Sequence, residues 1–328
     1  MSKLEMGRMS RRAVLFAAAA TAASAPALAR TRPYRAPRTV FGAPDLQGFW
    51  TNATYTPLER EKPFTTLTIS PEEARKAEAI FARIGEFTTE HPDPLGQKDS
   101  EFWETGSGLA RVRGEIRTSF IVDPADGKIP YTDESKTRFH IGDPKWKRGL
   151  DNPEDRSVTE RCVASEGGYP PNMPSPDGNY LQIVQTRDHV AMLSEKYHDA
   201  HVIRLGGQTH DPAAVTSWMG DAVGRWEGET LVVENTNFSP VAARSYGVKL
   251  SAASTIVERF THLGPDDLIY EFTVTDPTFY TRPWRAEMPF TRTEARMYEY
   301  TCHEGNYGLT DILSGARRLE KAGEKAGR

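Results

Sequence analysis

Three short β-forming segments follow one another in the middle of the chain, with only a few residues between them. They cover residues 180–186, 189–196 and 198–205, and the last ends at Gly206 and Gly207. β-Forming residues alternate with polar ones in each segment, as is typical of a strand with one buried face. Because parallel strands need a long crossover connection, links this short predict an antiparallel meander.

Similar segments recur along much of the chain, with turn signals between them. They are residues 117–122, 128–131, 229–235, 257–261, 268–275, 284–290 and 297–301. Short strands at such regular intervals predict a mainly β fold, an antiparallel barrel or a sandwich.

A few flanking helices are expected beside the strands. Ser70 followed by Pro71 and two glutamates is a helix start signal, and this helix is expected to end near Ile84. Residues 306–321 carry an apolar stripe at helical spacing and predict a C-terminal helix.

The N-terminus has the features of an export signal. Arg11 and Arg12 precede a run of small apolar residues, and Ala27-Leu28-Ala29 fits a cleavage site. We therefore expect residues 1–29 to be a twin-arginine signal peptide, recognised by the twin-arginine export machinery. Residues 30–328 would form a single β-rich domain with an extended N-terminal arm, and the protein would be periplasmic or secreted.

Charge and hydropathy exclude several classes of partner. Without residues 1–29 the chain keeps 37 basic and 44 acidic residues, a formal charge of −7. This charge argues against binding to nucleic acid or to an anionic membrane surface. No later apolar run is long enough to span a bilayer, so no integral membrane segment is expected.

The two cysteines, Cys162 and Cys302, both follow the export signal. An even number of cysteines in an oxidising compartment favours one disulfide bond. Two buried thiols are the alternative. Neither cysteine lies in a recognisable nucleophile motif.

The meander carries a dense group of polar side chains: Glu195, His198, Asp199, His201 and Arg204. Alternate residues of a strand share a face, so His198 and Arg204 should point one way and Asp199 and His201 the other. A metal needs three or four ligands at one point, and this split disfavours such a site. The group is therefore predicted to form one wall of a pocket.

A second polar group lies near the C-terminus and includes His303, Glu304 and Tyr307. A disulfide to Cys302 would bring this group close to the Gly- and Pro-rich residues 165–179 that precede the meander. Those residues form either a pocket wall or a plain connector.

These groups supply candidates for general acid–base chemistry, which needs a histidine or carboxylate held by a partner. The catalytic candidates are His198, Asp199, His303, Glu304 and Glu195. The candidates for substrate binding are Tyr180, Arg204, Trp218, Asn237 and Tyr307, which offer hydrogen bonds or an aromatic surface. Each histidine could instead be a structural residue. The absence of nucleotide and phosphate motifs argues against a hydride-transfer enzyme or a kinase.

The motifs GRWEGETLVVENTNF at 224–238 and CHEGNYG at 302–308 resemble a family of exported bacterial proteins with no assigned activity. The resemblance covers most of the chain after residue 40 and implies one domain, export and the pairing of Cys162 with Cys302. The Gly-x-Trp sequence before a strand is similar to that of lipocalin-like barrels, which concerns the fold alone.

The leading hypothesis is an exported enzyme without cofactor or metal. It would act by acid–base chemistry on a small organic substrate, such as an aromatic or alicyclic molecule, as a lyase, isomerase or hydrolase. The first alternative is a non-catalytic periplasmic protein that binds or carries a small molecule. The second alternative is a metal-dependent hydrolase.

Overall fold

The computed structural model describes residues 34–90, 108–138, 150–156, 158–164, 170–175, 178–239 and 248–323. The predicted signal peptide lies outside these residues. No helix in the described part of the chain combines the length and the apolar character that crossing a membrane requires.

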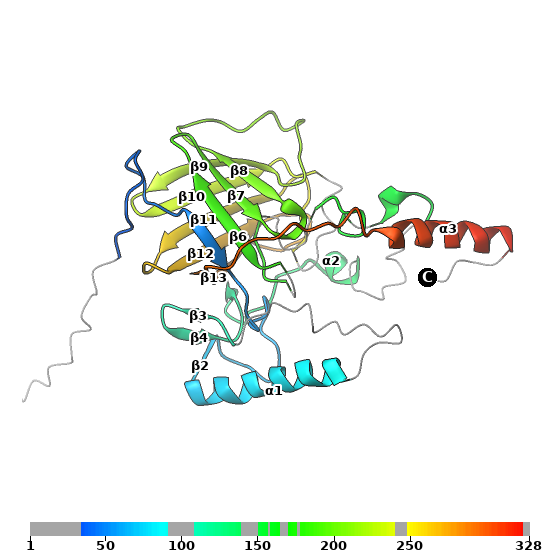
Figure 1. Ribbon diagram of the computed structural model, residues 1–328, viewed down its shortest axis with the longest axis horizontal. Helices are drawn as coiled ribbons and strands as arrows, with labels where there is room; N and C mark the ends of the chain where they lie inside the picture. The colour runs from blue at the N-terminus through cyan, green and yellow to red at the C-terminus, as the bar shows by residue number, and fades with distance from the viewer. Residues whose placement is uncertain are drawn as a thin grey trace, which may run out of the picture. The chain divides into compact units, whose positions relative to one another are not determined.

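Nine strands close an antiparallel β-barrel (Figure 1). In barrel order they are β1 (Gly48–Thr51), β6 (Tyr180–Gln185), β7 (His189–Ser194), β8 (Ala200–Arg204), β9 (Asp221–Glu227), β10 (Thr230–Thr236), β11 (Thr255–His262), β12 (Asp267–Thr275) and β13 (Trp284–Arg292). The barrel closes where β1 pairs with β13, at Trp50 opposite Arg292 and Thr51 opposite Thr291. Of the two predicted architectures, the barrel is the one that forms.

The predicted meander is confirmed as β6, β7 and β8, which pair antiparallel. One pair in the barrel departs from the antiparallel pattern, because β8 and β9 run parallel. The chain between them, residues 205–220, is long enough to return to the starting end of the sheet. Such a connection is what a parallel pair requires.

The remaining elements lie outside the barrel wall. Strands β2 (Thr68–Ile69), β3 (Arg111–Val112) and β4 (Glu115–Arg117) form a small sheet, and β5 (Ile121–Asp123) pairs with β13. The α-helices are α1 (Pro71–Glu90), α2 (Asp133–Arg138) and α3 (Tyr307–Lys321), and short 3-10 helices occur at η2 (Pro153–Asp155) and η3 (Lys196–His198).

Helix α1 begins where the sequence predicts. The Ser70 hydroxyl accepts a hydrogen bond from the Glu73 N–H, and the Glu73 carboxylate accepts one from the Ser70 N–H. This reciprocal capping box satisfies two backbone donors at the helix start. The helix ends at Glu90 rather than near Ile84, and it continues through Gly85.

Two predicted strands do not form. Residues 128–131 contain Pro130, which has no N–H to donate, and they contribute only an isolated bridge between Tyr131 and Tyr280. Residues 297–301 are extended but unpaired with any strand. By that point the barrel has closed, so no edge of the wall remains for them to join.

Large side chains fill the interior of the barrel. Along β11 the residues alternate between half-exposed and buried, as expected for a wall with one wet face. The largest inward side chains are completely buried and belong to one core cluster: Trp50, Phe260, Tyr270, Phe272, Trp284 and Phe290. The interior is thus a packed core, as in other small barrels.

The small sheet is fixed to the outside of the barrel by charged side chains. Arg113 and Arg117 approach the Glu287 carboxylate on β13 at 3.3 and 3.4 Å. Arg117 and Glu287 are both buried, so neither charge is screened by bulk water. Each has a further partner, since Arg285 lies 2.8 Å from Glu287 and Glu115 lies 3.4 Å from Arg117.

Cys162 and Cys302 form a disulfide bond, as predicted, across 140 positions of sequence. Asn306 reinforces the connection, because its side-chain Nδ2 donates to the Glu160 carbonyl at 2.9 Å. The same Asn306 caps α3 by accepting from the Leu309 N–H. The segment after the barrel is therefore tied to residues 158–164 by covalent and polar contacts.

We expect the Cys162→Ala/Cys302→Ala double variant to lose about 3–5 kcal/mol of unfolding free energy, since the bond closes a long loop. Urea unfolding of both proteins measures the difference. A reductant should destabilise the wild type and leave the double variant unchanged. Equal stability of the two proteins would contradict a structural role for the disulfide.

Candidate functional site

A chain of buried polar side chains crosses the interior of the barrel near one end. It consists of His201 on β8, Asn235 on β10, Glu258 on β11 and Tyr270 on β12. Each of these residues occupies an inward position of its strand, and Glu258 is 1% exposed. Polar groups this deeply buried need hydrogen-bond partners, and these four residues supply them to one another.

The hydrogen bonds of this chain have a fixed direction. Asn235 Nδ2 lies 2.6 Å from Glu258 Oε2 and 3.3 Å from the Ile256 carbonyl, and both of these atoms are acceptors. The amide oxygen of Asn235 therefore faces His201 Nε2, at 2.8 Å. Because an amide oxygen only accepts, Nε2 of His201 must carry the proton. In the neutral ring Nδ1 is then the basic atom.

Tyr270 completes the chain at its other end. Its hydroxyl donates to Glu258 Oε1 and accepts from the backbone N–H of Asn172 at 3.1 Å. Burial, followed by the nearby Glu258 charge, raises the pKa of Tyr270 well above its ordinary value. The hydroxyl therefore stays protonated and remains a hydrogen-bond donor at neutral pH.

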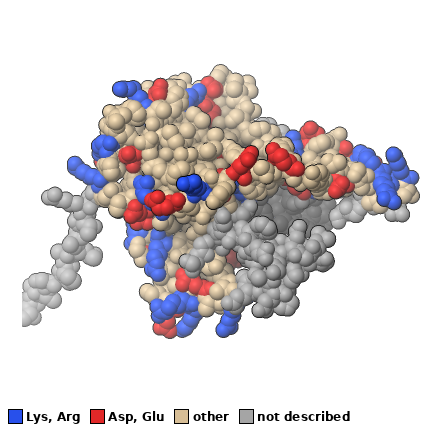
Figure 2. Space-filling view, viewed as in Figure 1, with Lys and Arg blue, Asp and Glu red and all other residues tan. Residues whose placement is uncertain are grey.

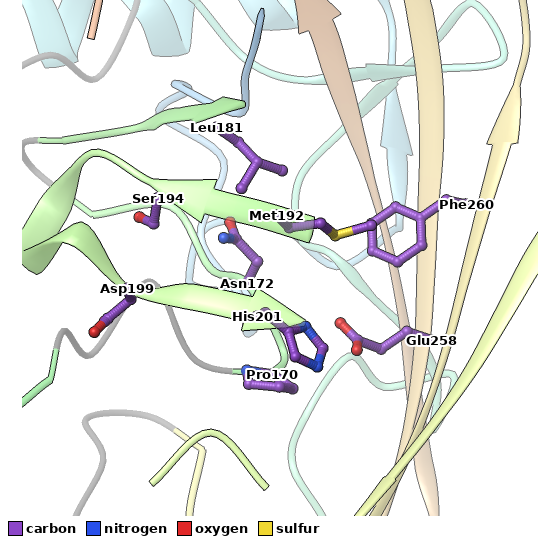
Figure 3. Close-up of a pocket in the computed structure, with 9 residues that line it drawn as sticks. All are labelled: Pro170, Asn172, Leu181, Met192, Ser194, Asp199, His201, Glu258 and Phe260. Carbon is purple, nitrogen blue, oxygen red and sulfur yellow. The ribbon is translucent and has the colours of Figure 1, made fainter. Parts of the chain in front are cut away.

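An enclosed cavity of about 10 Å³ borders this chain (Figure 3). Its lining residues come mostly from the barrel strands: Pro170, Asn172, Leu181, Met192, Ser194, Asp199, His201, Glu258 and Phe260. In Figure 3 the His201 ring and the Glu258 carboxylate face each other beside Pro170. The cavity has room for about one water molecule, and its polar lining suits one.

The polar residues of the meander divide between two sides, as predicted, but His198 lies in the 3-10 helix η3 rather than in a strand. Asp199 and His201 are buried, and Asp199 lines the cavity. His198 is exposed, and its Nε2 accepts a hydrogen bond from the Tyr300 N–H at 2.9 Å. Glu195 accepts from the Tyr298 N–H at 3.0 Å. Of the catalytic candidates in the meander, only Asp199 reaches the cavity.

The candidates near the C-terminus lie outside the barrel. His303 and Glu304 are exposed, in the turn before α3, and Tyr307 is 75% exposed. The disulfide does bring this region to the meander, but the contacts come from Tyr298 and Tyr300. None of these three side chains lines the enclosed cavity.

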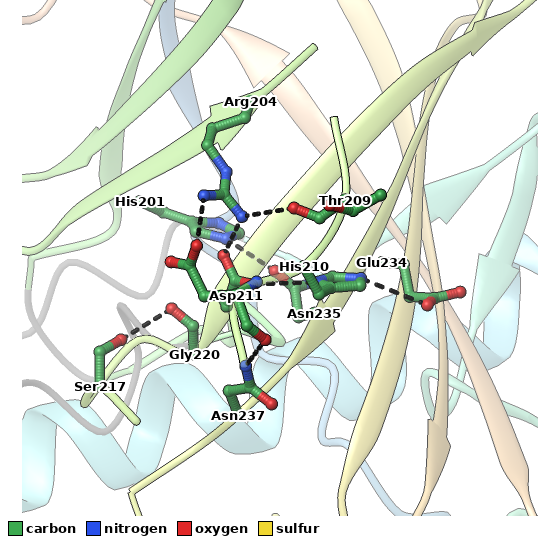
Figure 4. A network of polar contacts seen from close by, with 11 residues as sticks. His201, Arg204, Thr209, His210, Asp211, Ser217, Gly220, Glu234, Asn235 and Asn237 are labelled. Atoms are coloured by element: carbon green, nitrogen blue, oxygen red, sulfur yellow. Dashed lines mark hydrogen bonds and ion pairs between the residues drawn. The ribbon is translucent and has the colours of Figure 1, made fainter. Parts of the chain in front are cut away.

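Arg204 and Asn237 belong to a polar network on the outer surface (Figure 4). Arg204 donates to Asp221 Oδ1 at 2.6 Å, and His210 Nδ1 lies 3.0 Å from the other oxygen of Asp221. Asn237 Nδ2 donates to the Asp211 carbonyl at 2.9 Å. These bonds fix residues 205–220 against β9 and β10, which is a structural role.

The two remaining candidates also lie away from the cavity. Trp218 packs in a small apolar cluster around Val158 and Ala164. Tyr180 is half-buried on the outer face of β6, beside a groove of about 770 Å³.

The inner chain contains three residues that the sequence analysis did not select: Asn235, Glu258 and Tyr270. A sequence signal for Glu258 does exist. It lies on the same face of its strand as Ile256 and Phe260, both of which are apolar and buried. A charged residue in the buried phase of a strand marks a polar site inside the barrel.

The described residues contain no group of three or more His, Cys, Asp or Glu side chains placed to hold a metal ion. Three titratable groups apart from the inner chain are strongly perturbed. Burial raises the pKa of Tyr131 and of Tyr280 well above its ordinary value. Burial lowers the pKa of Lys249 to about 8. Its ammonium group donates to the Ser135 carbonyl at 3.0 Å and lies 4.6 Å from the Tyr131 ring centroid. These contacts hold α2 against the chain that leads into β11.

The fold and the inner chain define the class of protein: a closed nine-stranded β-barrel with a buried polar chain at one end. No family model and no curated protein matches the sequence. One solved structure with partial similarity is a secretary abundant heat soluble (SAHS) protein from Ramazzottius varieornatus. It is 13% identical, with a TM-score of 0.24 over 42% of this chain and 87% of that one. Similarity at this level carries no argument about function. The resemblance to exported bacterial proteins stays a prediction.

The opposite roles of two histidines can be tested directly. In the neutral rings, we expect His201 to be protonated at Nε2 and His198 at Nδ1, because their partners are an acceptor and a donor respectively. Long-range proton–nitrogen NMR spectra of labelled protein distinguish the two tautomers. If both rings show the same tautomer, one of these hydrogen bonds is wrong.

We expect Asn235→Asp to lower the unfolding free energy by about 3–5 kcal/mol near neutral pH, since a second carboxylate would face buried Glu258. Two buried carboxylates would bind a proton more tightly in the folded protein than in the unfolded chain. The loss of unfolding free energy should therefore become smaller as the pH falls. Urea unfolding at several pH values measures this.

Asn237→Asp, directly after the same strand, is the matched control: it removes one surface hydrogen bond to the Asp211 carbonyl and should lower stability much less. Equal effects of the two substitutions would contradict the buried hydrogen-bond chain.

Proposed function

We propose that this protein is an exported enzyme that acts by acid–base chemistry on a small organic substrate, with His201 as the group that transfers the proton. The observation that carries the proposal is the directed chain from Tyr270 through Glu258 and Asn235 to His201. It holds one histidine in a known tautomer at the wall of an enclosed cavity, as proton transfer requires.

The chain can support a change of charge on His201. When Nδ1 takes up a proton, the ring becomes a cation whose Nε2–H still donates to Asn235. Asn235 in turn donates to Glu258, so the carboxylate stabilises the positive ring through the amide. Water is largely excluded, which strengthens this interaction. Asn235 and Glu258 are therefore positioning residues, and His201 is the group that meets the substrate.

Besides His201, the cavity is lined by two titratable groups, Glu258 and Asp199. An acid and a base at one cavity are what lyases, isomerases and hydrolases of this kind use. His198 and His303 fit the role less well, because both are exposed and Nε2 of His198 already accepts from the Tyr300 N–H.

The size of the cavity limits how a substrate can bind. With about 10 Å³ available, an organic molecule must displace part of the lining. Pro170, Asn172 and Asp199 are the lining residues that do not belong to a barrel strand, and Pro170 and Asn172 lie in the chain before β6. We infer that the reacting group enters on their side, where loop backbone yields more easily than a closed wall.

Export and surface charge agree with such a substrate. The twin arginines and the small-residue cleavage site support export to the periplasm or beyond. Over the barrel face in Figure 2, basic and acidic side chains intermingle and form no patch of one sign. This pattern favours a small molecule over a polyanion.

The alternative is a protein that binds or carries a small molecule without changing it. A hollow of about 650 Å³ with a mainly apolar lining favours it, since Tyr55, Phe64, Phe81 and Leu109 border that hollow. Its volume lies in the usual range for small-molecule sites.

The test incubates the protein with a panel of small ketones, lactones and hydroxy acids in deuterated water, followed by NMR. Proton abstraction shows as deuterium uptake, and cleavage or addition shows as new signals. We expect His201→Gln to lower the rate on a converted compound at least about 100-fold, because glutamine can donate to Asn235 but cannot take up a proton.

The matched control is His189→Gln, which replaces a surface histidine of β7. Thermal unfolding verifies that each variant is folded. Unchanged conversion by folded His201→Gln would refute the assignment of His201. Binding without conversion of any compound would favour the carrier.

A further inference from the structure

The outer face of the barrel carries a row of four hydrogen-bonding side chains, and we propose that this row is the floor of a binding site for an oligosaccharide chain. The row is Tyr180, Thr51, Thr291 and Asp267. It shares no residue with the inner chain, so this inference stands independently of the proposed enzyme function.

Strand pairing places the four residues side by side. Thr51 on β1 lies opposite Tyr180 on β6 and also opposite Thr291 on β13, and Thr291 lies opposite Asp267 on β12. Adjacent strands are about 4.8 Å apart, so the row spans about 14 Å across the wall. Its members are therefore regularly spaced along one line.

All four side chains point away from the barrel core. Their neighbours along the strands are buried: Trp50, Leu181, Leu268 and Phe290. Since strand residues alternate between faces, the members of the row must face outward. Packing of those neighbours holds the floor rigid, which reduces the entropy lost when a ligand binds.

The row lies in a groove of about 770 Å³, within the usual range for ligand sites. Glu78 of α1 and Arg111 of β3 line the side opposite the barrel wall. The buried pair of Arg117 and Glu287 fixes this side to the barrel. The groove thus has a floor and a wall built from different elements with a defined spacing.

The chemistry of the floor suits a chain of hydroxyl groups. A threonine hydroxyl both donates and accepts, as do the hydroxyls of a sugar. The Tyr180 ring at one end of the row offers an aromatic surface for the apolar face of a sugar ring. Regularly spaced partners on the protein match a ligand whose hydroxyls repeat along its length.

Other extended ligands fit the groove less well. Glu78 and Asp267 against Arg111 give mixed charge, which disfavours a polyanion such as a nucleic acid. An extended peptide binds most readily by adding a strand to a free sheet edge. Here β1 is paired on both sides, with β6 and β13, so the wall offers no edge.

The test is calorimetric titration of the full chain with cellopentaose, chitopentaose, xylopentaose and maltopentaose. At least one of the four should bind. Tyr180→Ala should weaken that binding about tenfold or more, because the stacking surface is lost. Thr291→Val, which keeps the shape and removes the hydroxyl, should weaken it about fivefold.

Thr273→Val is the matched control, on the outer face of β12 but outside the groove, and it should bind as the wild type does. Thermal unfolding confirms that each variant is folded. Asp267→Asn is a further row variant, at the opposite end of the row from Tyr180. No binding of any of the four sugars at millimolar concentration would overturn the proposal. So would equal affinity of the wild type and the folded row variants, or binding of short peptides in place of sugars.

Discussion

The whole wall depends on β1, a strand of four residues that pairs on both sides. Arg292 covers this junction, with its guanidinium 4.5 Å from the centroid of the Trp50 ring. A Cβ on Gly48 would lie 2.4 Å from that guanidinium, and the φ of Gly48 is +137°. Only glycine adopts such a backbone without strain. The backbone of β1, where Gly48 pairs with Ile183 of β6, therefore requires glycine at this position.

Closure gives the wall two different faces with separate chemistry. Inside, exclusion of water makes each hydrogen bond of the chain from Tyr270 to His201 stronger and each unpaired polar group costly. Outside, the same strands present hydroxyl and carboxylate groups to water at regular spacing. Thr291 and Glu258 thus lie on strands of one wall but face a groove and a sealed interior respectively.

Local pattern is enough to predict most strands but not the closure or the inner site. The strands of the meander follow from alternation of apolar and polar residues. The helix start at Ser70 follows from capping over a few residues. The partners of β1 are distant in sequence. Glu258 likewise bonds Asn235, which lies 23 positions away. Asn172 is connected to Glu258 only through the hydroxyl of Tyr270. Contacts of this kind are set by tertiary packing, which a single sequence does not display.

The closed wall also explains how the segment after β13 packs against the meander. The segment after β13 reaches the meander through the disulfide but finds no free edge to pair with. Its backbone N–H groups still need acceptors, and those of Tyr298 and Tyr300 find them in the side chains of Glu195 and His198. His198, whose ring nitrogen accepts a backbone hydrogen bond, therefore has a structural role. The Nε2 of His201 instead contacts the side-chain oxygen of Asn235 inside the barrel.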